Sequence, residues 1–187
     1  MIFRRFLTIA ACAAWAGVCL AGPKPPATDE ALLKAYDAFR AGDPVRLQRA
    51  AGQIDGAHVL APYLEYWRMK LRLEEIPAAD VHAFLEQQAG SYLADRLRAD
   101  WLKELGKRGA WQELEQQLPL LVQDDLEIRC YAWLSRLARL DDSAFDEARV
   151  IWLEPRELPE GCNALVERML DAQRIGLEDV WRRVRVL

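Results

Sequence analysis

The most regular pattern of apolar and polar residues lies at Ser91–Trp111. Its apolar residues recur at every fourth position, with charged residues between them, which is typical of one face of an α-helix. Ser91 can cap the start of this helix, and we expect Gly106 and Gly109 to end it, because glycine adopts the left-handed C-cap conformation without strain. Trp111 then opens a second amphipathic segment, so the stretch predicts a helical hairpin. The apolar positions are Leu93, Leu97, Trp101 and Leu105.

The same spacing recurs along the chain and predicts about ten helices. In the first of them, Leu33, Tyr36 and Phe39 are expected to face inward. Helix pairs spaced by roughly 30–40 residues are typical of tetratricopeptide-like solenoids. We therefore predict an all-α fold, a right-handed superhelix of antiparallel helical hairpins, with a globular helical bundle as the alternative. The expected helices cover residues 30–40, 44–51 and 58–76, a short segment from 76–77, the hairpin 91–118, and residues 124–140, 143–153, 162–173 and 177–184.

The N-terminal residues have the composition of a secretory signal peptide, which we place at residues 1–22. Arg4 and Arg5 precede an uncharged apolar run, and small residues follow it. A Pro-rich leader would occupy residues 23–28 and the superhelical domain residues 29–187. The alternatives are an uncleaved membrane anchor, for which the run is short, and a lipoprotein modified at Cys12. After signal cleavage we expect a periplasmic protein that is not an integral membrane protein.

Export changes the interpretation of the cysteines. Removal of the signal peptide would leave only Cys130 and Cys162. In an oxidising compartment two such residues favour a disulfide, which would join adjacent helical hairpins. Two buried free thiols are the alternative.

Charge and residue spacing argue against several classes of function. The net charge is −4 at pH 7, whereas a nucleic-acid-binding protein normally has a basic face. The only histidines are His58 and His82, and no metal-ligand spacing occurs, so we expect no metal and no cofactor. Paired carboxylates could act in glycoside chemistry, but each pair falls at a helix end or turn, where water solvates it. The pairs are Glu74–Glu75, Asp124–Asp125 and Asp141–Asp142.

Five blocks, in order, resemble the N-terminal superhelical region of the soluble lytic transglycosylases of Gram-negative bacteria, which cleave peptidoglycan glycan strands. This resemblance implies a periplasmic location, peptidoglycan glycan strands as the partner, and pairing of Cys130 with Cys162. The blocks are LAPYLEYWRMKLRL at Leu60–Leu73, SYLADRLRADWLKELGKRGAW at Ser91–Trp111, LEIRCYAWLSRL at Leu126–Leu137, FDEARVIWL at Phe145–Leu153 and LPEGCNALVERML at Leu158–Leu170.

The chain departs from this family in one respect that matters for catalysis. The family places its catalytic Glu, usually in a Glu-Ser pair, in a C-terminal lysozyme-like domain, and this sequence contains no Glu-Ser pair. We therefore expect a superhelix that is incomplete at its C-terminus, inactive by itself, and a scaffold that positions glycan strands. A tetratricopeptide-like periplasmic adaptor for a protein partner is the alternative.

Aromatic residues on two of the predicted helices are candidates for glycan contact, since aromatic faces suit sugar rings. Their helical spacing also fits packing in the core. The candidates are Tyr63, Tyr66, Trp67 and Trp101.

Mass spectrometry of the non-reduced protein can test the expected pairing of Cys130 with Cys162. A proteolytic digest should contain a cross-linked peptide pair that separates on reduction, because an oxidising compartment and adjacent hairpins favour the bond. Alkylation of both thiols without prior reduction would contradict the prediction.

Overall fold

The structure is a computed structural model, and it describes residues 27–123, 125–152 and 157–186. The predicted signal peptide, Cys12 and most of the predicted leader lie outside these residues. The described residues form ten α-helices and two short 3₁₀ helices, with no strand, which confirms the predicted all-α fold. The helices are α1 Ala27–Arg40, α2 Pro44–Ala51, α3 Ala61–Leu71, α4 Ala78–Gln87, α5 Tyr92–Arg108, α6 Trp111–Gln117, η1 Leu118–Leu120, α7 Leu126–Ala138, α8 Ser143–Trp152, η2 Glu160–Cys162, α9 Asn163–Asp171 and α10 Leu177–Val186.

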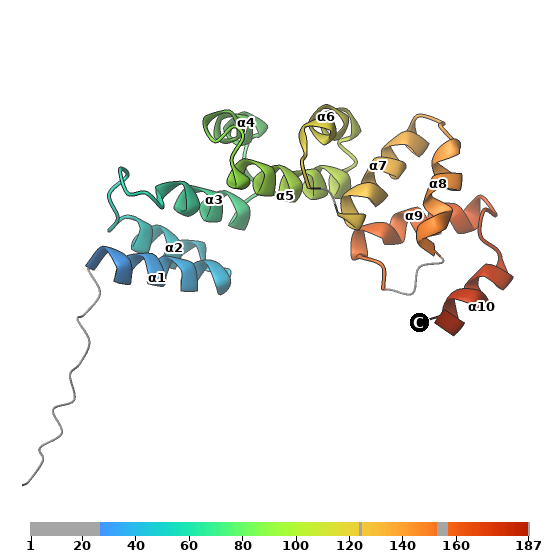
Figure 1. Ribbon diagram of the computed structural model, residues 1–187, viewed down its shortest axis with the longest axis horizontal. Coiled ribbons are helices and arrows are strands. Elements are labelled where there is room, and N and C mark those ends of the chain that lie inside the picture. The colour runs from blue at the N-terminus through green and yellow to red at the C-terminus, as the bar shows by residue number, and fades with distance from the viewer. Residues whose placement is uncertain (1–26, 124, 153–156, 187) are drawn as a thin grey trace, which may run out of the picture.

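The helices form a bent array with α5 at its centre (Figure 1). Helix α5 contacts α3, α4, α6 and α7. Helices α4 and α6 lie on one side of it in Figure 1, whereas α1, α2 and α10 lie on the other side, toward the two ends of the array. One continuous apolar core runs through these layers, so that each helical hairpin is stabilised chiefly by its neighbours.

Helix α5 begins and ends through capping interactions, one of which differs from the prediction. Ser91 Oγ accepts a hydrogen bond from the backbone N–H of Ala94 at 3.2 Å, as predicted. Gly109 forms the left-handed C-cap with φ 67°. Gly106, which was expected to help end the helix, instead lies within it and is buried. A glycine is needed at this position for a different reason, which is that the ring of Tyr131 on α7 lies directly against it.

Tyr131 occupies a narrow space between two glycines. A Cβ added to Gly106 would overlap the aromatic ring, and one added to Gly161 would lie 2.6 Å from Tyr131 Oη. The neighbouring residue, Cys130, is joined to Cys162 by a disulfide bond, and both cysteines are fully buried. The contacts with Tyr131 and the disulfide therefore hold α5, α7 and η2 together.

The inward face of α1 differs from the prediction. Leu33 and Tyr36 are exposed, by 60% and 42%, and Phe39 is only partly buried. The buried positions of α1 are its small residues, because α1 packs along α2 and bulky side chains would hold the two helices apart. Small apolar and large apolar residues follow the same period in this helix, so spacing alone did not distinguish them. The buried residues are Ala31, Ala35 and Ala38.

Helix α7 starts at a cluster of charged residues that also connects it to α5. Asp125 caps the helix by accepting from the backbone N–H of Ile128 at 3.0 Å. Lys103 Nζ of α5 lies 2.5 Å from Asp125 Oδ2 and 3.1 Å from Glu127 Oε2. Burial alone would raise the pKa of Asp125, but the hydrogen bonds from Lys103 and Ile128 outweigh it and lower that pKa. The carboxylate is therefore ionised at neutral pH, as both contacts require.

Substitution of Gly106 tests whether the contact with Tyr131 limits stability. Alanine has a helix propensity better than that of glycine by about 1 kcal/mol. We nevertheless expect Gly106→Ala to lower the free energy of unfolding by about 1–3 kcal/mol, because the new Cβ overlaps the ring and forces it to move. Urea denaturation measures this change.

The matched control is Gly56→Ala. Gly56 has open space around the added Cβ and no positive φ, so its stability should change by less than about 0.5 kcal/mol. A Gly106→Ala variant as stable as the control would show that Tyr131 can be displaced at no cost.

Candidate functional site

Helix α3 presents two different faces, and together they form the candidate site. Residues 63, 66, 67 and 70 form one stripe at i, i+3, i+4 and i+7, and this stripe is aromatic apart from Lys70. Residues 65, 68, 69 and 72 form a second stripe, which contains two arginines. The stripes are offset by two residues, or about 200° around the helix, and therefore point in roughly opposite directions.

The aromatic face is completed by α1. The ring of Trp67 lies 5.4 Å from that of Tyr36, 5.6 Å from that of Phe39 and 6.3 Å from that of Tyr63. Trp67 is buried, whereas Tyr36 and Tyr63 are exposed by 42% and 38%. The packed rings hold both tyrosines beside Trp67. The result is a pair of accessible rings on a rigid apolar support.

Tyr66 has a structural role rather than an exposed one. Its hydroxyl donates to Asp100 Oδ2 of α5 at 2.9 Å, and Lys70 Nζ donates to Asp100 Oδ1 at 2.7 Å. Burial, followed by the nearby Asp100 carboxylate, raises the pKa of Tyr66 well above its usual range. The hydroxyl therefore remains protonated and ties α3 to α5.

Trp101 lies in the core of the array. It is 1% exposed, and the ring of His82 meets it edge-on at 5.0 Å. His82 Nε2 in turn lies 2.9 Å from Glu113 Oε1 of α6.

Three of the four residues considered for glycan contact, Tyr66, Trp67 and Trp101, are thus buried, whereas Tyr63 is exposed. Tyr36 is accessible too, and the sequence did not single it out, because its spacing placed it on the inward face. The signal that could have identified it is the alanine stripe on the same helix, which competes for that inward face.

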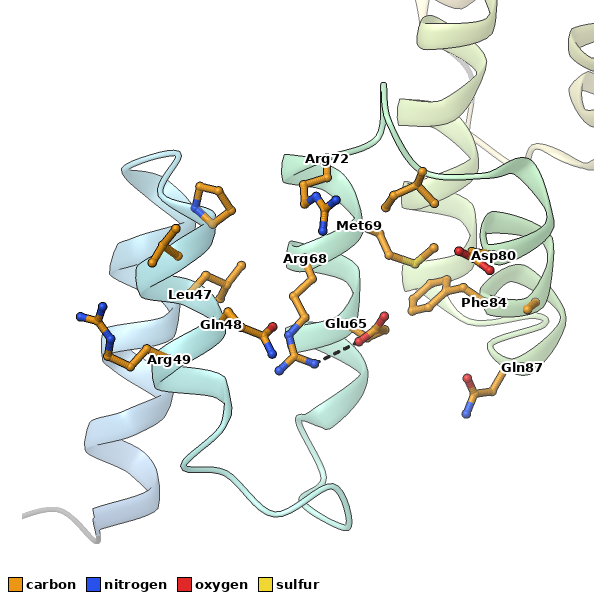
Figure 2. Close-up of a pocket in the computed structure, with 14 residues that line it drawn as sticks. Leu47, Gln48, Arg49, Glu65, Arg68, Met69, Arg72, Asp80, Phe84 and Gln87 are labelled. Carbon is orange, nitrogen blue, oxygen red and sulfur yellow. Dashed lines mark hydrogen bonds and ion pairs between the residues drawn. The ribbon is translucent and has the colours of Figure 1, made fainter.

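A groove of about 960 Å³ lies beside the other face of α3, between α2, α3 and α4 (Figure 2). Its apolar residues include Leu47, Met69 and Phe84, and Figure 2 shows Met69 and Phe84 pointing toward each other between α3 and α4. Polar side chains line the rest of the groove, and three of them are cationic. These charged residues are Arg49, Arg68 and Arg72, together with Glu65 and Asp80.

Arg68 extends from α3 toward Gln48 of α2 (Figure 2). Its Nη1 donates to Glu65 Oε2 at 3.2 Å. Its Nε is inaccessible to solvent and has no hydrogen-bond partner among the described residues. A buried donor without an acceptor costs about 1–3 kcal/mol. We name this surface the basic groove.

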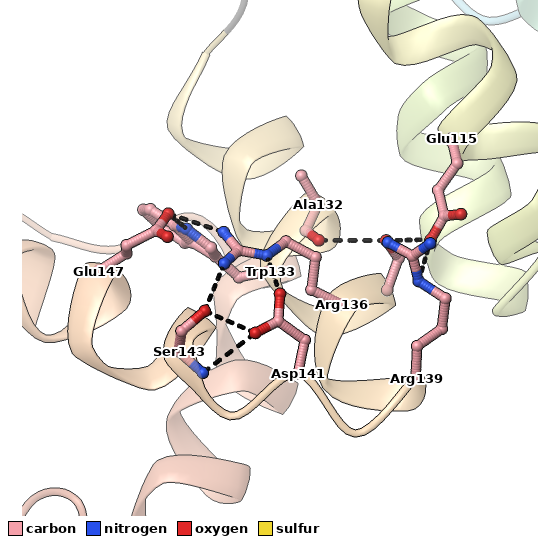
Figure 3. A network of polar contacts seen from close by, with 9 residues as sticks. Glu115, Ala132, Trp133, Arg136, Arg139, Asp141, Ser143 and Glu147 are labelled. Atoms are coloured by element: carbon pink, nitrogen blue, oxygen red, sulfur yellow. Dashed lines mark hydrogen bonds and ion pairs between the residues drawn. The ribbon is translucent and has the colours of Figure 1, made fainter.

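The acidic pairs expected at helix ends do lie there. Asp141 accepts from Arg136 Nε at 2.8 Å and from the Ser143 hydroxyl, and Arg136 Nη1 also pairs with Glu147 at 2.7 Å (Figure 3). The Ser143 hydrogen bond, together with Arg136, lowers the pKa of Asp141, and Arg136 lowers that of Glu147. These carboxylates therefore join α7 to α8 through Arg136.

The remaining pairs are placed similarly, as far as the structure describes them. Glu74 and Glu75 follow the end of α3, and Glu75 pairs with Arg72 at 3.4 Å. Asp142 lies 3.6 Å from Arg174, and Asp124 lies outside the described residues. Within those residues no group of His, Cys, Asp and Glu side chains could hold a metal ion. No helix in the described part of the chain is long and apolar enough to cross a bilayer.

This fold defines a class of protein with solved examples. The 70-kDa soluble lytic transglycosylase from Escherichia coli matches with a TM-score of 0.61 and 20% identity over 85% of this chain and 26% of its own. An inactive mutant of the lytic transglycosylase Slt from Pseudomonas aeruginosa matches with a TM-score of 0.62 and 20% identity, over 83% of this chain and 25% of its own. A complex of the 70-kDa soluble lytic transglycosylase with bulgecin A matches with a TM-score of 0.61 and 19% identity, over 85% of this chain and 26% of that chain.

The chain therefore has the fold of a helical portion of the soluble lytic transglycosylases, and it spans about a quarter of the length of those proteins. The fold that the five sequence blocks implied is confirmed. No family model matches the sequence, and no curated protein matches it either.

The contrast between buried and exposed aromatic residues can be tested by truncation. Trp101→Ala should lower the free energy of unfolding by about 3–5 kcal/mol, because it leaves a large cavity in the core. Tyr63→Ala should cost much less, since that ring is partly exposed. Thermal or urea denaturation of the two variants measures the difference, and equal losses would contradict the assignment.

Proposed function

We propose that this chain is the superhelical scaffold of a periplasmic lytic transglycosylase that acts on peptidoglycan, and that it positions glycan strands for a catalytic domain. The observation that carries the proposal is the match of fold to two lytic transglycosylases over more than four-fifths of the chain. The disulfide between Cys130 and Cys162 is consistent with the periplasm, because such bonds persist in oxidising compartments.

The arrangement of the helices suits a scaffold. A rigid surface is needed to hold a long polymer in one place, and α5 supplies one by contacting helices on both sides of the centre. Polar contacts from the middle of α5 reinforce it, through Asp100 toward α3 and through Lys103 toward α7. Of the paired carboxylates, Glu75, Asp141 and Asp142 each lie beside an arginine, so we assign the cleavage step to another part of the enzyme.

We assign glycan contact to Tyr36 and Tyr63. The face of an aromatic ring is electronegative and the C–H groups of a sugar ring are weakly electropositive, so the two pack together. Both rings are accessible and are held by contacts with Trp67. Arg40, whose guanidinium carbon lies 6.0 Å from the Tyr36 ring centre, adds a donor for sugar hydroxyl or carbonyl oxygens at the edge.

A periplasmic adaptor that binds a protein partner is the second candidate, and one observation favours it. Helix α10 is joined to α8 through Arg183, which donates to the Trp152 carbonyl at 2.6 Å. Its outer side leaves a row of apolar residues exposed at i, i+4 and i+7, the spacing with which amphipathic helices bind one another. These residues are Leu177, Trp181 and Val184.

Co-sedimentation of the purified chain with murein sacculi tests the first function. We expect the chain to bind sacculi, and the double variant Tyr36→Ala/Tyr63→Ala to bind several-fold less, since each lost stacking contact is worth about 0.5–1.5 kcal/mol. Tyr92→Ala is the matched control, because Tyr92 is an exposed tyrosine of α5 that makes no ring contact with Tyr36, Tyr63 or Trp67 among the described residues.

A chain that does not bind sacculi would refute the scaffold function. If such a chain instead loses binding to a purified periplasmic protein on Trp181→Ala, the adaptor function is supported. Equal loss of sacculi binding in the Tyr92→Ala control would show that Tyr36 and Tyr63 are not specific contacts.

A further inference from the structure

The outer side of α10 is an exposed apolar stripe. Leu177, Trp181 and Val184 are 73%, 55% and 58% exposed, and they follow one another at i, i+4 and i+7. Residues at this spacing share one face of a helix. The inner side of α10 is occupied, because Val180 packs against the core and Arg183 is buried. The helix is thus held by one side, and its apolar stripe is left open to a further contact.

A row of charged residues runs beside this stripe, acidic at one end and basic at the other. Glu178, Arg182 and Arg185 are exposed and also follow one another at i, i+4 and i+7. The Glu178 side chain is 88% exposed and lies 3.8 Å from Arg182, so this ion pair is weak and easily exchanged. Asp179, whose Oδ2 accepts from the backbone N–H of Gly176 at 3.1 Å, stabilises the start of the helix. Glu178 is therefore available to a partner.

Both rows are nearly symmetric about Trp181. Leu177 lies four residues before it and Val184 three residues after it, whereas Glu178 and Arg185 lie three before and four after. A two-fold axis between two copies of α10, perpendicular to both helices, makes them antiparallel and keeps their charged rows on the same side. That symmetry sets Leu177 beside Val184 of the second copy, and Glu178 beside Arg185 of the second copy.

We propose that two copies of this chain associate through α10, with the helices antiparallel and the two Trp181 rings in contact at the two-fold axis. Charge complementarity identifies the occupant, since charged rows beside an apolar stripe set partner choice and orientation. An acidic protein would match only the arginines and a basic protein only Glu178, whereas a second copy matches both ends. A single helix pair forms a small interface, below about 1,200 Å², so the dimer is weak. Such a dimer goes beyond both proposed functions and depends on neither.

Sedimentation equilibrium tests for this dimer. Residues 1–22 are removed, because the apolar run of the predicted signal peptide would associate independently of α10. The average mass should rise with concentration from that of one copy toward that of two. Trp181→Ala should weaken self-association by about tenfold or more, because a central aromatic residue carries much of the free energy of an interface. Trp181 is exposed in the single chain, so this change does not threaten folding, and circular dichroism checks it.

Charge reversal tests the antiparallel arrangement. In Arg185→Glu the Glu178 side chain would meet a glutamate of the second copy, and in Glu178→Arg the Arg185 side chain would meet an arginine. Each variant alone should self-associate about tenfold more weakly than the unchanged chain, because two attractive pairs become repulsive. An equimolar mixture of the two variants should recover association, because every pair across the interface is again opposite in charge.

Arg46→Glu is the matched control. Arg46 is an exposed arginine of α2, so this variant has the net charge of Arg185→Glu while α10 is unchanged. It should self-associate as the unchanged chain does. Its mixture with Glu178→Arg should associate less well than the mixture of the two α10 variants, since one of the two pairs stays repulsive.

Three results would overturn the proposal. In the first, the chain remains a single copy up to about 1 mM, where even a weak complex forms, and the stripe then belongs to a further helix or to another protein. In the second, Trp181→Ala leaves self-association intact. In the third, the mixture of charge-reversed variants does not recover. None of these results changes the expected binding to murein sacculi, so failure of the dimer is distinct from failure of the scaffold function.

Discussion

The contact of Tyr131 with two glycines is the constraint on which the middle of the array depends. An aromatic ring can lie between α5 and η2 only where neither backbone has a side chain, and Gly106 and Gly161 satisfy this condition. The disulfide of the adjacent Cys130 holds η2 in place against α7. Burial of the ring and the covalent link therefore act on the same three elements, and the capping ion pairs of Asp125 add to a geometry already set by packing.

The same rigidity gives α3 its two faces. Asp100, on α5, accepts hydrogen bonds from Tyr66 and Lys70, and so fixes the rotation of α3 about its own axis. A rotation fixed in this way directs the aromatic stripe toward α1 and the arginine stripe toward α2 and α4. The packing of Trp67 against the rings of α1 acts in the same direction, so the two candidate surfaces depend on both contacts.

The sequence predicted the helices well where caps and periodicity agreed. Ser91 caps the start of α5 and Gly109 caps its end, as expected. Pro62 lies in the first turn of α3, where its missing N–H does no harm. The predictions failed where two apolar patterns overlapped in one helix, as in α1, or where a glycine had a use other than a turn, as at Gly106. In both cases the deciding factor was how closely a neighbouring helix packs, and the spacing of apolar residues along one helix carries no information about this.

The sequence by itself determined the all-α fold and the order and approximate limits of its helices, because these follow from local spacing and capping. The resemblance to lytic transglycosylases came from the five sequence blocks. The tertiary structure decided which face of each helix is buried. It moved Tyr66, Trp67 and Trp101 into the interior, left Tyr36 and Tyr63 accessible, and placed Arg49 of α2 in the lining of the same groove as the arginines of α3. These outcomes depend on side chains that meet across helices, and the meeting of residues distant in sequence is a property of packing.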